Sequence, residues 1–288
     1  MAAKTELGRF PTADRVIFLV FLILISTPLV VLIGLPIPIS ESTRKSYELM
    51  NSLKSGDVLV MCFEMDVGAF PALGPGDMAA LKHAFTMVKE KGIKVIIFGT
   101  YESGVKIYID KILQETKEYW ESLNYGVDWV NFGWIPGHET AMATFARDVH
   151  TACSVDVYGT PVDELPIMKD IKTINDVTGI WYTTYSSPDM LPRQWSPLEW
   201  PGLKWTICST LFGTVSWLMP YVNAGSITSY VADQRGGAEY EVLIGKRGLG
   251  CKFMDAQSLG HIYGIALIIG SNVYYLYTHA KKPKRKEE

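Results

Sequence analysis

The pattern of hydrophobic and polar positions divides the chain into two apolar ends and a mixed middle. Residues 16–38 contain no charged side chain, and a helix of that length crosses a hydrocarbon core of about 30 Å. No small-residue cleavage site follows, so the segment is predicted to be a retained membrane anchor and not a cleaved signal peptide. Residues 258–278 are also free of Asp, Glu, Lys and Arg and form the second predicted span.

Between the two predicted spans, short apolar runs alternate with amphipathic stretches. Runs of this kind predict strands that are buried on both faces, and the amphipathic stretches predict helices. Strands are expected at 56–65, 93–99, 127–135 and 178–187, and helices at 74–92, 103–123 and 138–152. In the first of these helices, Asp77 is the predicted N-cap and Gly92 is the predicted C-terminal stop.

Strands and helices that alternate with short connections are typical of a parallel sheet between two layers of helices. The predicted fold class is therefore α/β, a three-layer Rossmann-like domain with a mostly parallel sheet, flanked by N- and C-terminal transmembrane helices. The expected segments are a cytoplasmic tail (1–15), a span (16–38), the α/β domain (39–204), a helical apolar segment (205–257), a second span (258–278) and a basic cytoplasmic tail (279–288).

The stretch 205–232 also lacks charged residues before Asp233, but its composition is only weakly apolar. It contains Gly, Ser, Thr and Asn, and Pro220 lies in its middle. A third span here would place the two basic tails on opposite sides of the membrane. We therefore expect a buried or interfacial pair of helices that packs on the domain, the membrane or a partner, and that offers an apolar contact surface.

Charge predicts the sidedness of the chain. Of 27 Lys and Arg, three lie in residues 1–15 and five in 281–288, which leaves 19 between them against 26 of the 30 Asp and Glu. Basic tails next to spans stay in the cytoplasm, so residues 39–257 are expected outside it, anchored in the cell membrane. A net charge of about −7 on this middle segment argues against nucleic acid as a partner.

Two short motifs carry a resemblance to a known group. The chain contains "YGVDWVNFGW" at 125–134 and "GGAEYEVLIG" at 236–245, between an N-terminal anchor and a C-terminal span. In these features it resembles uncharacterised prokaryotic membrane proteins with an α/β domain, and the resemblance extends over most of the chain. It implies the architecture and no activity, cofactor or catalytic residue.

The stretch that starts at His138 contains only part of a zinc-protease motif. Such a motif places two His four residues apart on one helical face, with a Glu beside the first. Here Glu139 follows His138, but position 142 is Met, and His150 lies about 18 Å further along a continuous helix. One metal ion cannot bridge that separation, so no metal site is predicted.

Nucleotide-binding signatures are incomplete in this sequence. A dinucleotide-binding turn needs three glycines in G-x-G-x-x-G spacing between a strand and a helix. The stretch 133–137 places Trp134 and Pro136 between two glycines, and in 74–77 the ring of Pro75 removes a backbone donor. No phosphate-binding G-x-x-x-x-G-K-[ST] motif occurs. These glycines and prolines are interpreted as chain reversals, and no cofactor is predicted.

Candidate site residues come from the ends of the predicted strands, because ligands of open α/β sheets bind outside the carboxyl ends of the strands. No G-x-S-x-G motif is present, so a serine nucleophile rests only on Ser103, with Glu64 and His138 as conceivable partners. The favoured alternative is that Ser103 is a helix N-cap. The weak catalytic candidates are Ser103, His138 and Glu64, and the ligand-binding candidates are Asp66, Asn131, Gly137 and Ser187.

The four cysteines do not change this reading. They are far apart in sequence and form no C-x-x-C motif, and Cys62 lies in an apolar run that predicts a buried free thiol.

The functional hypothesis is a membrane-anchored binding or assembly module that is not an enzyme. Its expected partners are the lipid bilayer and either further copies of the chain or another membrane protein. The alternative is a membrane-anchored hydrolase or transferase that uses the residues at the strand ends.

Overall fold

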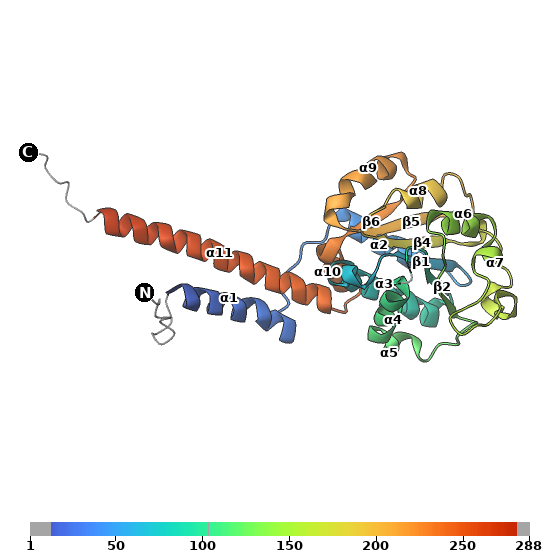
Figure 1. The fold of residues 1–288 in the computed structure, drawn as a ribbon, viewed down its shortest axis with the longest axis horizontal. Helices are drawn as coiled ribbons and strands as arrows, with labels where there is room; N and C mark the ends of the chain where they lie inside the picture. The colour runs from blue at the N-terminus through green and yellow to red at the C-terminus, as the bar shows by residue number, and fades with distance from the viewer. Residues whose placement is uncertain (1–12, 103, 281–288) are drawn as a thin grey trace, which may run out of the picture. The chain divides into compact units, whose positions relative to one another are not determined.

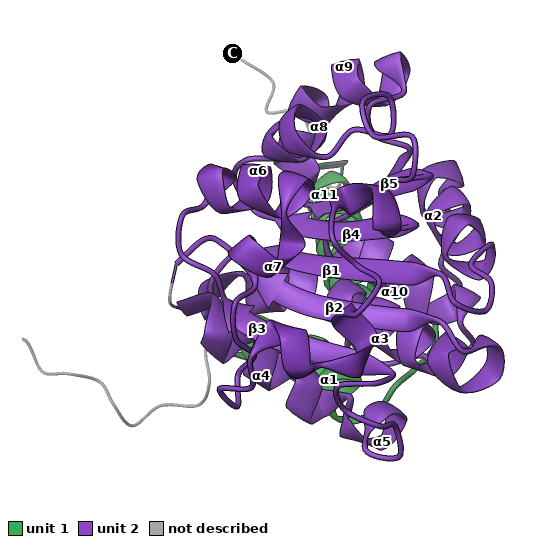
Figure 2. Ribbon diagram, turned by 90° about the vertical axis from the view of Figure 1, so that its right-hand side faces the viewer, with its two compact units in different colours: residues 1–35, 252–288 green, residues 36–251 purple. Residues whose placement is uncertain are grey.

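The computed structural model of the chain describes residues 13–102 and 104–280, which belong to two compact units. One unit is formed by residues 36–251 and contains the β-sheet (purple in Figure 2). The other combines the two ends of the chain, residues 1–35 and 252–288 (green in Figure 2). The candidate site and the sheet that positions it lie in the first unit.

Six parallel strands form one sheet in the order β3-β2-β1-β4-β5-β6 (Figure 1). The strands are β1 (Val58–Glu64), β2 (Lys94–Gly99), β3 (Trp129–Trp134), β4 (Gly179–Thr184), β5 (Trp205–Thr210) and β6 (Ser229–Ala232). Strands β2 and β3 follow on one side of β1, and β4, β5 and β6 follow on its other side. This is the strand order of a doubly wound Rossmann-type sheet, and the predicted α/β class with a parallel sheet is confirmed.

Alternate side chains of each strand enter two separate hydrophobic cores, one on each face of the sheet. In β1, Val60 and Cys62 belong to one core, while Leu59 and Met61 belong to the other. All seven residues of β1 are buried, which explains why its sequence is apolar without alternation.

Helices cover both faces of the sheet. The face with Leu59 and Met61 is covered by α2 (Glu41–Asn51), α3 (Phe70–Lys91), α4 (Gly104–Glu115), α5 (Lys117–Trp120) and α10 (Asp233–Leu243). The face with Val60 and Cys62 is covered by α6 (Glu139–Arg147), α7 (Val149–Ala152), α8 (Met190–Gln194) and α9 (Val215–Ala224). Short 3₁₀ helices lie in the connections: η1 (Val67–Ala69), η2 (Val162–Glu164), η3 (Pro166–Met168), η4 (Ile174–Asp176) and η5 (Phe212–Thr214).

The predicted helix at 74–92 is longer than expected, and its predicted N-cap is wrong. Helix α3 begins at Phe70, so Asp77 lies inside the helix, fully buried. Its carboxylate accepts hydrogen bonds from the Trp181 indole at 2.9 Å and from the hydroxyls of Tyr108 and Thr183 at 2.5 and 2.6 Å. Gly92 ends the helix as predicted, in the left-handed conformation with φ +70°.

Two of the other predicted helices are interrupted. The expected helix at 103–123 is divided between α4 and α5 at Thr116, whose hydroxyl bonds back to the carbonyl of Ile112 at 2.8 Å. The expected helix at 138–152 is divided between α6 and α7 at Asp148. The Asp148 side chain accepts a hydrogen bond from the backbone N–H of Thr151 at 2.9 Å and so caps the second piece.

The expectation of a helix pair at 205–232 is wrong, because this stretch contributes β5, α9 and β6 to the sheet. All six residues of β5 are buried. A parallel strand covered on both faces excludes charged side chains just as a buried helix does. The α/β unit therefore continues past the expected boundary at 204, and residues 205–251 belong to it.

The second unit contains α1 (Ala13–Val30) and α11 (Leu249–Ala280), the latter entering it from residue 252. Within the described residues, α11 is the helix that is long and apolar enough to cross a membrane, and it includes the predicted span 258–278. The predicted span 16–38 is helical only as far as Val30. A second membrane span is not shown.

Hydrogen bonds hold α1 and its following loop against α11 within this unit. The buried carboxylate of Asp255 accepts from three consecutive backbone N–H groups, those of Ile33, Gly34 and Leu35, at 2.8–3.0 Å. The Tyr263 hydroxyl donates to the carbonyl of Ile17 at 2.8 Å. The two helices therefore run antiparallel along each other.

Candidate functional site

The candidate site lies at the carboxyl edge of the sheet, where the strand order reverses between β1 and β4. Glu64 is the last residue of β1, and Thr184, its register partner, is the last residue of β4. In doubly wound sheets the loops on the two sides of such a reversal diverge, and ligands bind between them.

Glu64 is a buried carboxyl group with only one of its oxygens hydrogen-bonded. Its side chain is 1% exposed. Its Oε1 accepts hydrogen bonds from the backbone N–H of Thr100, at 2.9 Å, and from the Thr100 hydroxyl. Its Oε2 is buried and has no hydrogen-bond partner within the described residues. Burial raises the pKa of Glu64 from 4.5 to about 7, although the two hydrogen bonds from Thr100 lower it.

His138 is the residue that lies next to the unpartnered oxygen. Its Nε2 is 3.2 Å from Glu64 Oε2, but the contact lacks hydrogen-bond geometry. The side chain of His138 is 41% exposed, so the pair has one buried and one accessible member. At this edge of the sheet, a carboxyl group and an imidazole therefore lie side by side, where both can contact a hydrogen-bonding ligand.

The loop after β3 brings His138 to this position. Gly137 has φ +125°, and His138 itself has φ +52°, a left-handed value that is uncommon outside glycine. The backbone N–H of His138 donates to the carbonyl of Thr100 at 3.2 Å. Thr100 therefore holds both partners, Glu64 through its N–H and hydroxyl and His138 through its carbonyl.

Two tyrosines extend the cluster. The Tyr101 ring lies 5.5 Å from the His138 ring, and the hydroxyl of Tyr185 donates to the hydroxyl of Tyr101 at 2.5 Å. This hydrogen bond is the main cause that raises the pKa of Tyr185. Thr100 and Tyr185 were not among the residues selected from the sequence. Their positions directly after β2 and β4 are the signal that points to them, since these strands end at the same edge.

A salt-bridge network links the loops that follow β3 and β4. The guanidinium of Arg193, on α8, lies 3.1 Å from Glu139 and 3.0 Å from Asp189. Glu139 directly follows His138 in sequence. The network therefore connects the segment that carries His138 to the segment after β4.

The remaining candidates have different positions. Asp66 and Ser187 form local turns: Asp66 accepts from Gly68 N–H at 2.7 Å, and Ser187 N–H donates to the Thr184 hydroxyl at 3.2 Å. Asn131 lies in the middle of β3, opposite Ile97, and lines a separate cavity of about 470 Å³ beside Tyr125 and Trp129. Ser103 lies outside the described residues, so it is not placed relative to His138.

The loop after β1 does not have the features of a phosphate-binding turn. In dinucleotide-binding sheets, the backbone N–H groups at the helix start after β1 hold the pyrophosphate. Here the carboxylate of Asp66 caps η1 and accepts from Gly68 N–H. A negative charge therefore already occupies the position in which a phosphate would bind.

Within residues 13–102 and 104–280, no three His, Cys, Asp or Glu side chains are placed to hold a metal ion. All four cysteines are buried free thiols, and burial raises the pKa of Cys62. No protein family, curated protein or solved structure matches the chain.

Proposed function

We propose that the chain is a membrane-anchored α/β binding protein that takes a small polar ligand at the carboxyl edge of its sheet, in contact with Glu64 and His138. The observation that supports this proposal is Glu64 Oε2, a buried oxygen without a hydrogen-bond partner among the described residues, next to a partly exposed imidazole. An unsatisfied buried polar atom costs roughly 1–3 kcal/mol, and a ligand hydroxyl or amide group would satisfy it.

Native mass spectrometry of the full chain, released from its own membranes, tests this proposal. We expect the wild-type protein to retain a small molecule that Glu64→Gln and His138→Ala both lose. His150→Ala is the matched control, because His150 lies on α7 and bonds to Asp163 and Met168 instead. A wild-type protein without a bound small molecule, or a molecule that survives both substitutions, contradicts the proposal.

A second candidate function is a hydrolase or transferase at the same residues. It is supported by the raised pKa of Glu64, about 7, because a general acid or base acts best when its pKa is near the working pH. Turnover of chromogenic ester or phosphate substrates that Glu64→Gln abolishes would favour this alternative. Binding without turnover would favour the binding protein.

For the membrane arrangement we propose two spans, with both termini in the cytoplasm and the central domain outside the cell membrane. The proposal is supported by α11, by the five basic residues that follow its apolar part, and by the apolar surface of α1. Phe18 and Leu22 of α1 are 71% and 57% exposed, which suits contact with lipid. The resemblance to prokaryotic membrane proteins of this layout remains a prediction.

Assembly with further copies or with another membrane protein is also proposed, and its support comes from η5 and α9. Phe212 and Trp217 are 75% and 62% exposed, and they lie in the stretch that lacks charged residues. Exposed apolar side chains on such a stretch are typical of protein or membrane contacts. Cross-linking in native membranes should give discrete products that Trp217→Ser weakens; cross-linking that yields only monomer contradicts assembly.

A further inference from the structure

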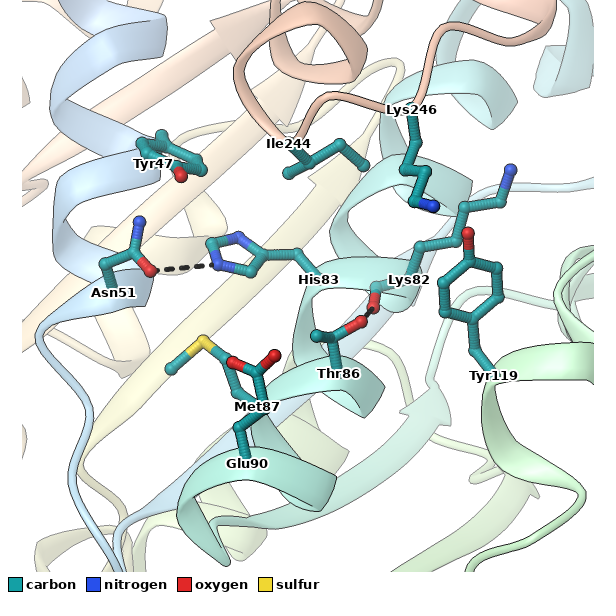
Figure 3. Close-up of a pocket in the computed structure, with 10 residues that line it drawn as sticks. All are labelled: Tyr47, Asn51, Lys82, His83, Thr86, Met87, Glu90, Tyr119, Ile244 and Lys246. Atoms are coloured by element: carbon teal, nitrogen blue, oxygen red, sulfur yellow. Dashed lines mark hydrogen bonds between the residues drawn. The ribbon is translucent and has the colours of Figure 1, made fainter.

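A polar cavity lies on the helical layer of the α/β unit (Figure 3), and neither Glu64 nor His138 lines it. It has a volume of about 190 Å³. It is formed by the last turns of α2, the second half of α3, α5 and the segment between α10 and α11. Its lining includes Asn51, Lys82, His83, Glu90, Tyr119 and Lys246.

Two lysines in this cavity lack an anionic partner. Lys82 comes from α3 and Lys246 from the segment before α11, and neither ammonium group meets a carboxylate or carbonyl acceptor among the described residues. Lys82 Nζ lies 5.8 Å from the centre of the Tyr119 ring. In Figure 3, both ammonium groups and the Tyr119 hydroxyl lie on the same side of the view, while Asn51 and Glu90 lie on the other.

The floor of the cavity is neutral. His83 is 8% exposed, and its ring nitrogens contact the Tyr240 hydroxyl at 2.9 Å and Asn51 Oδ1 at 3.3 Å. Burial, together with the charge of Lys91, lowers the pKa of His83 to about 4, so the ring is uncharged at neutral pH. The charged groups that line the cavity are therefore the two lysines and Glu90, which has no salt-bridge partner in the described part of the chain. One positive charge is in excess.

We propose that this cavity binds a phosphate group through Lys82, Lys246 and the hydroxyl of Tyr119. The two ammonium groups supply several charge-assisted donors, and phosphate oxygens are strong acceptors for such donors. The Tyr119 hydroxyl forms no hydrogen bond within the described residues, so it is available as a further donor. The phosphate belongs either to a free phosphorylated small molecule or to a lipid headgroup. Lys246 precedes α11, the helix apolar enough to span a membrane, by three residues.

This site is independent of the proposed ligand site at the carboxyl edge. Helix α3 ends at Lys91 and leads directly into the first residue of β2, Lys94. The second half of α3 therefore lies towards the amino ends of the strands. Glu64 and His138 lie at the opposite edge, and neither of them lines this cavity.

Isothermal titration calorimetry of the full chain in neutral detergent tests the proposal, with inorganic phosphate as the probe and chloride at equal ionic strength as the reference. We expect Lys82→Gln and Lys246→Gln each to weaken phosphate binding roughly tenfold, the effect of losing one hydrogen bond to a charged group. Lys89→Gln is the matched control, because Lys89 is an exposed lysine of α3 outside the cavity. Glu90→Gln should strengthen binding several-fold, since it removes the repelling charge.

The same titration with dihexanoyl phosphatidic acid and dihexanoyl phosphatidylcholine separates the two sources of phosphate. Binding of inorganic phosphate that the acyl chains do not improve assigns the site to a free phosphorylated molecule. Binding of the phosphatidic acid alone assigns it to an anionic headgroup. The proposal is overturned if wild type binds neither probe, or if binding is unchanged in the double lysine variant. Gain of binding in Glu90→Gln does not depend on the folding of the lysine variants.

Discussion

Glu64 combines burial with incomplete hydrogen bonding, and this combination defines the chemistry at the carboxyl edge. Removal from water disfavours its charged form, while Thr100 stabilises that form through one oxygen only. The other oxygen lies beside His138 at 3.2 Å. Because the pKa of Glu64 is about 7, a small change in the surroundings, such as the arrival of a ligand, would change its protonation state.

The raised pKa of Glu64 predicts how stability depends on pH. The folded state holds this proton more tightly than the unfolded state, so the free energy of unfolding falls as pH rises from about 4.5 to about 7 and stays lower above it. Between pH 5 and pH 8, this titration lowers the free energy of unfolding of the wild type by about 1–3 kcal/mol, and we expect Glu64→Gln to lack that decrease. Chemical unfolding of the full chain in detergent at the two pH values measures it.

Other buried groups contribute to the same curve, so the difference between variant and wild type is the quantity to compare. Burial also raises the pKa of Asp77, to about 6, which acts in the same direction as Glu64. The lowered pKa of His83, about 4, acts oppositely, since stability then rises with pH up to about 6.5. Equal pH slopes in wild type and Glu64→Gln would show that Glu64 does not titrate in this range.

At the residue scale, the sequence points to the members of the site but not to their contacts. Glu64 and His138 were predictable because Glu64 ends one strand and His138 follows another. Their contact depends on the backbone conformations of Gly137 and His138, which no periodicity indicates. For Asp77, the sequence pattern predicted the wrong role, that of a helix N-cap. The stretch of Gly and Pro before it resembles a helix start, yet tertiary hydrogen bonds from three residues of α4 and β4 hold it inside α3.

At the scale of elements, α3 and α10 approach each other through a pair of glycines. Gly76 of α3 and Gly237 of α10 face each other, and a Cβ atom on Gly237 would lie 2.7 Å from the backbone nitrogen of Gly76. Two backbones are in contact there, so no flexible side chain can move aside. This close packing allows α10 to cover the sheet beside α3.

We therefore expect Gly237→Ala to destabilise the protein by about 1–3 kcal/mol, as overpacking does, even though alanine favours a helix more than glycine. Gly213→Ala is the control, because a Cβ there meets nothing within 4 Å. Thermal unfolding of the full chain in detergent compares the two variants. Equal midpoints would mean that the two helices can separate without cost.

The stretch 205–232 shows why some elements were not predictable. Its strands are short, flanked by polar residues and free of charge, and a buried helix would have the same composition. What distinguishes them is pairing: β5 lies beside β4 and β6 beside β5. These long-range contacts are not visible in a local pattern, whereas β1 and β2, with the apolar runs Val58–Met61 and Val95–Ile97, were predictable.

At the scale of the whole molecule, the proposed sidedness gives a direct prediction. In right-side-out vesicles, an added protease should digest the central domain and leave epitope tags at both termini intact. The physical reason is that basic residues next to a span favour the cytoplasmic side, and five of them follow residue 278. Loss of the tags while the central domain survives would invert the arrangement. Loss of one tag only would mean a single span.

The binding of a polar ligand in contact with Glu64 and His138 is tested by a crystallographic map of the full chain purified from native membranes. We expect non-protein density within hydrogen-bond distance of Glu64 Oε2, in contact with the imidazole of His138 and absent in Glu64→Gln. A map in which His138 closes onto Glu64 Oε2 with hydrogen-bond geometry, with no density other than water at this edge, would contradict it.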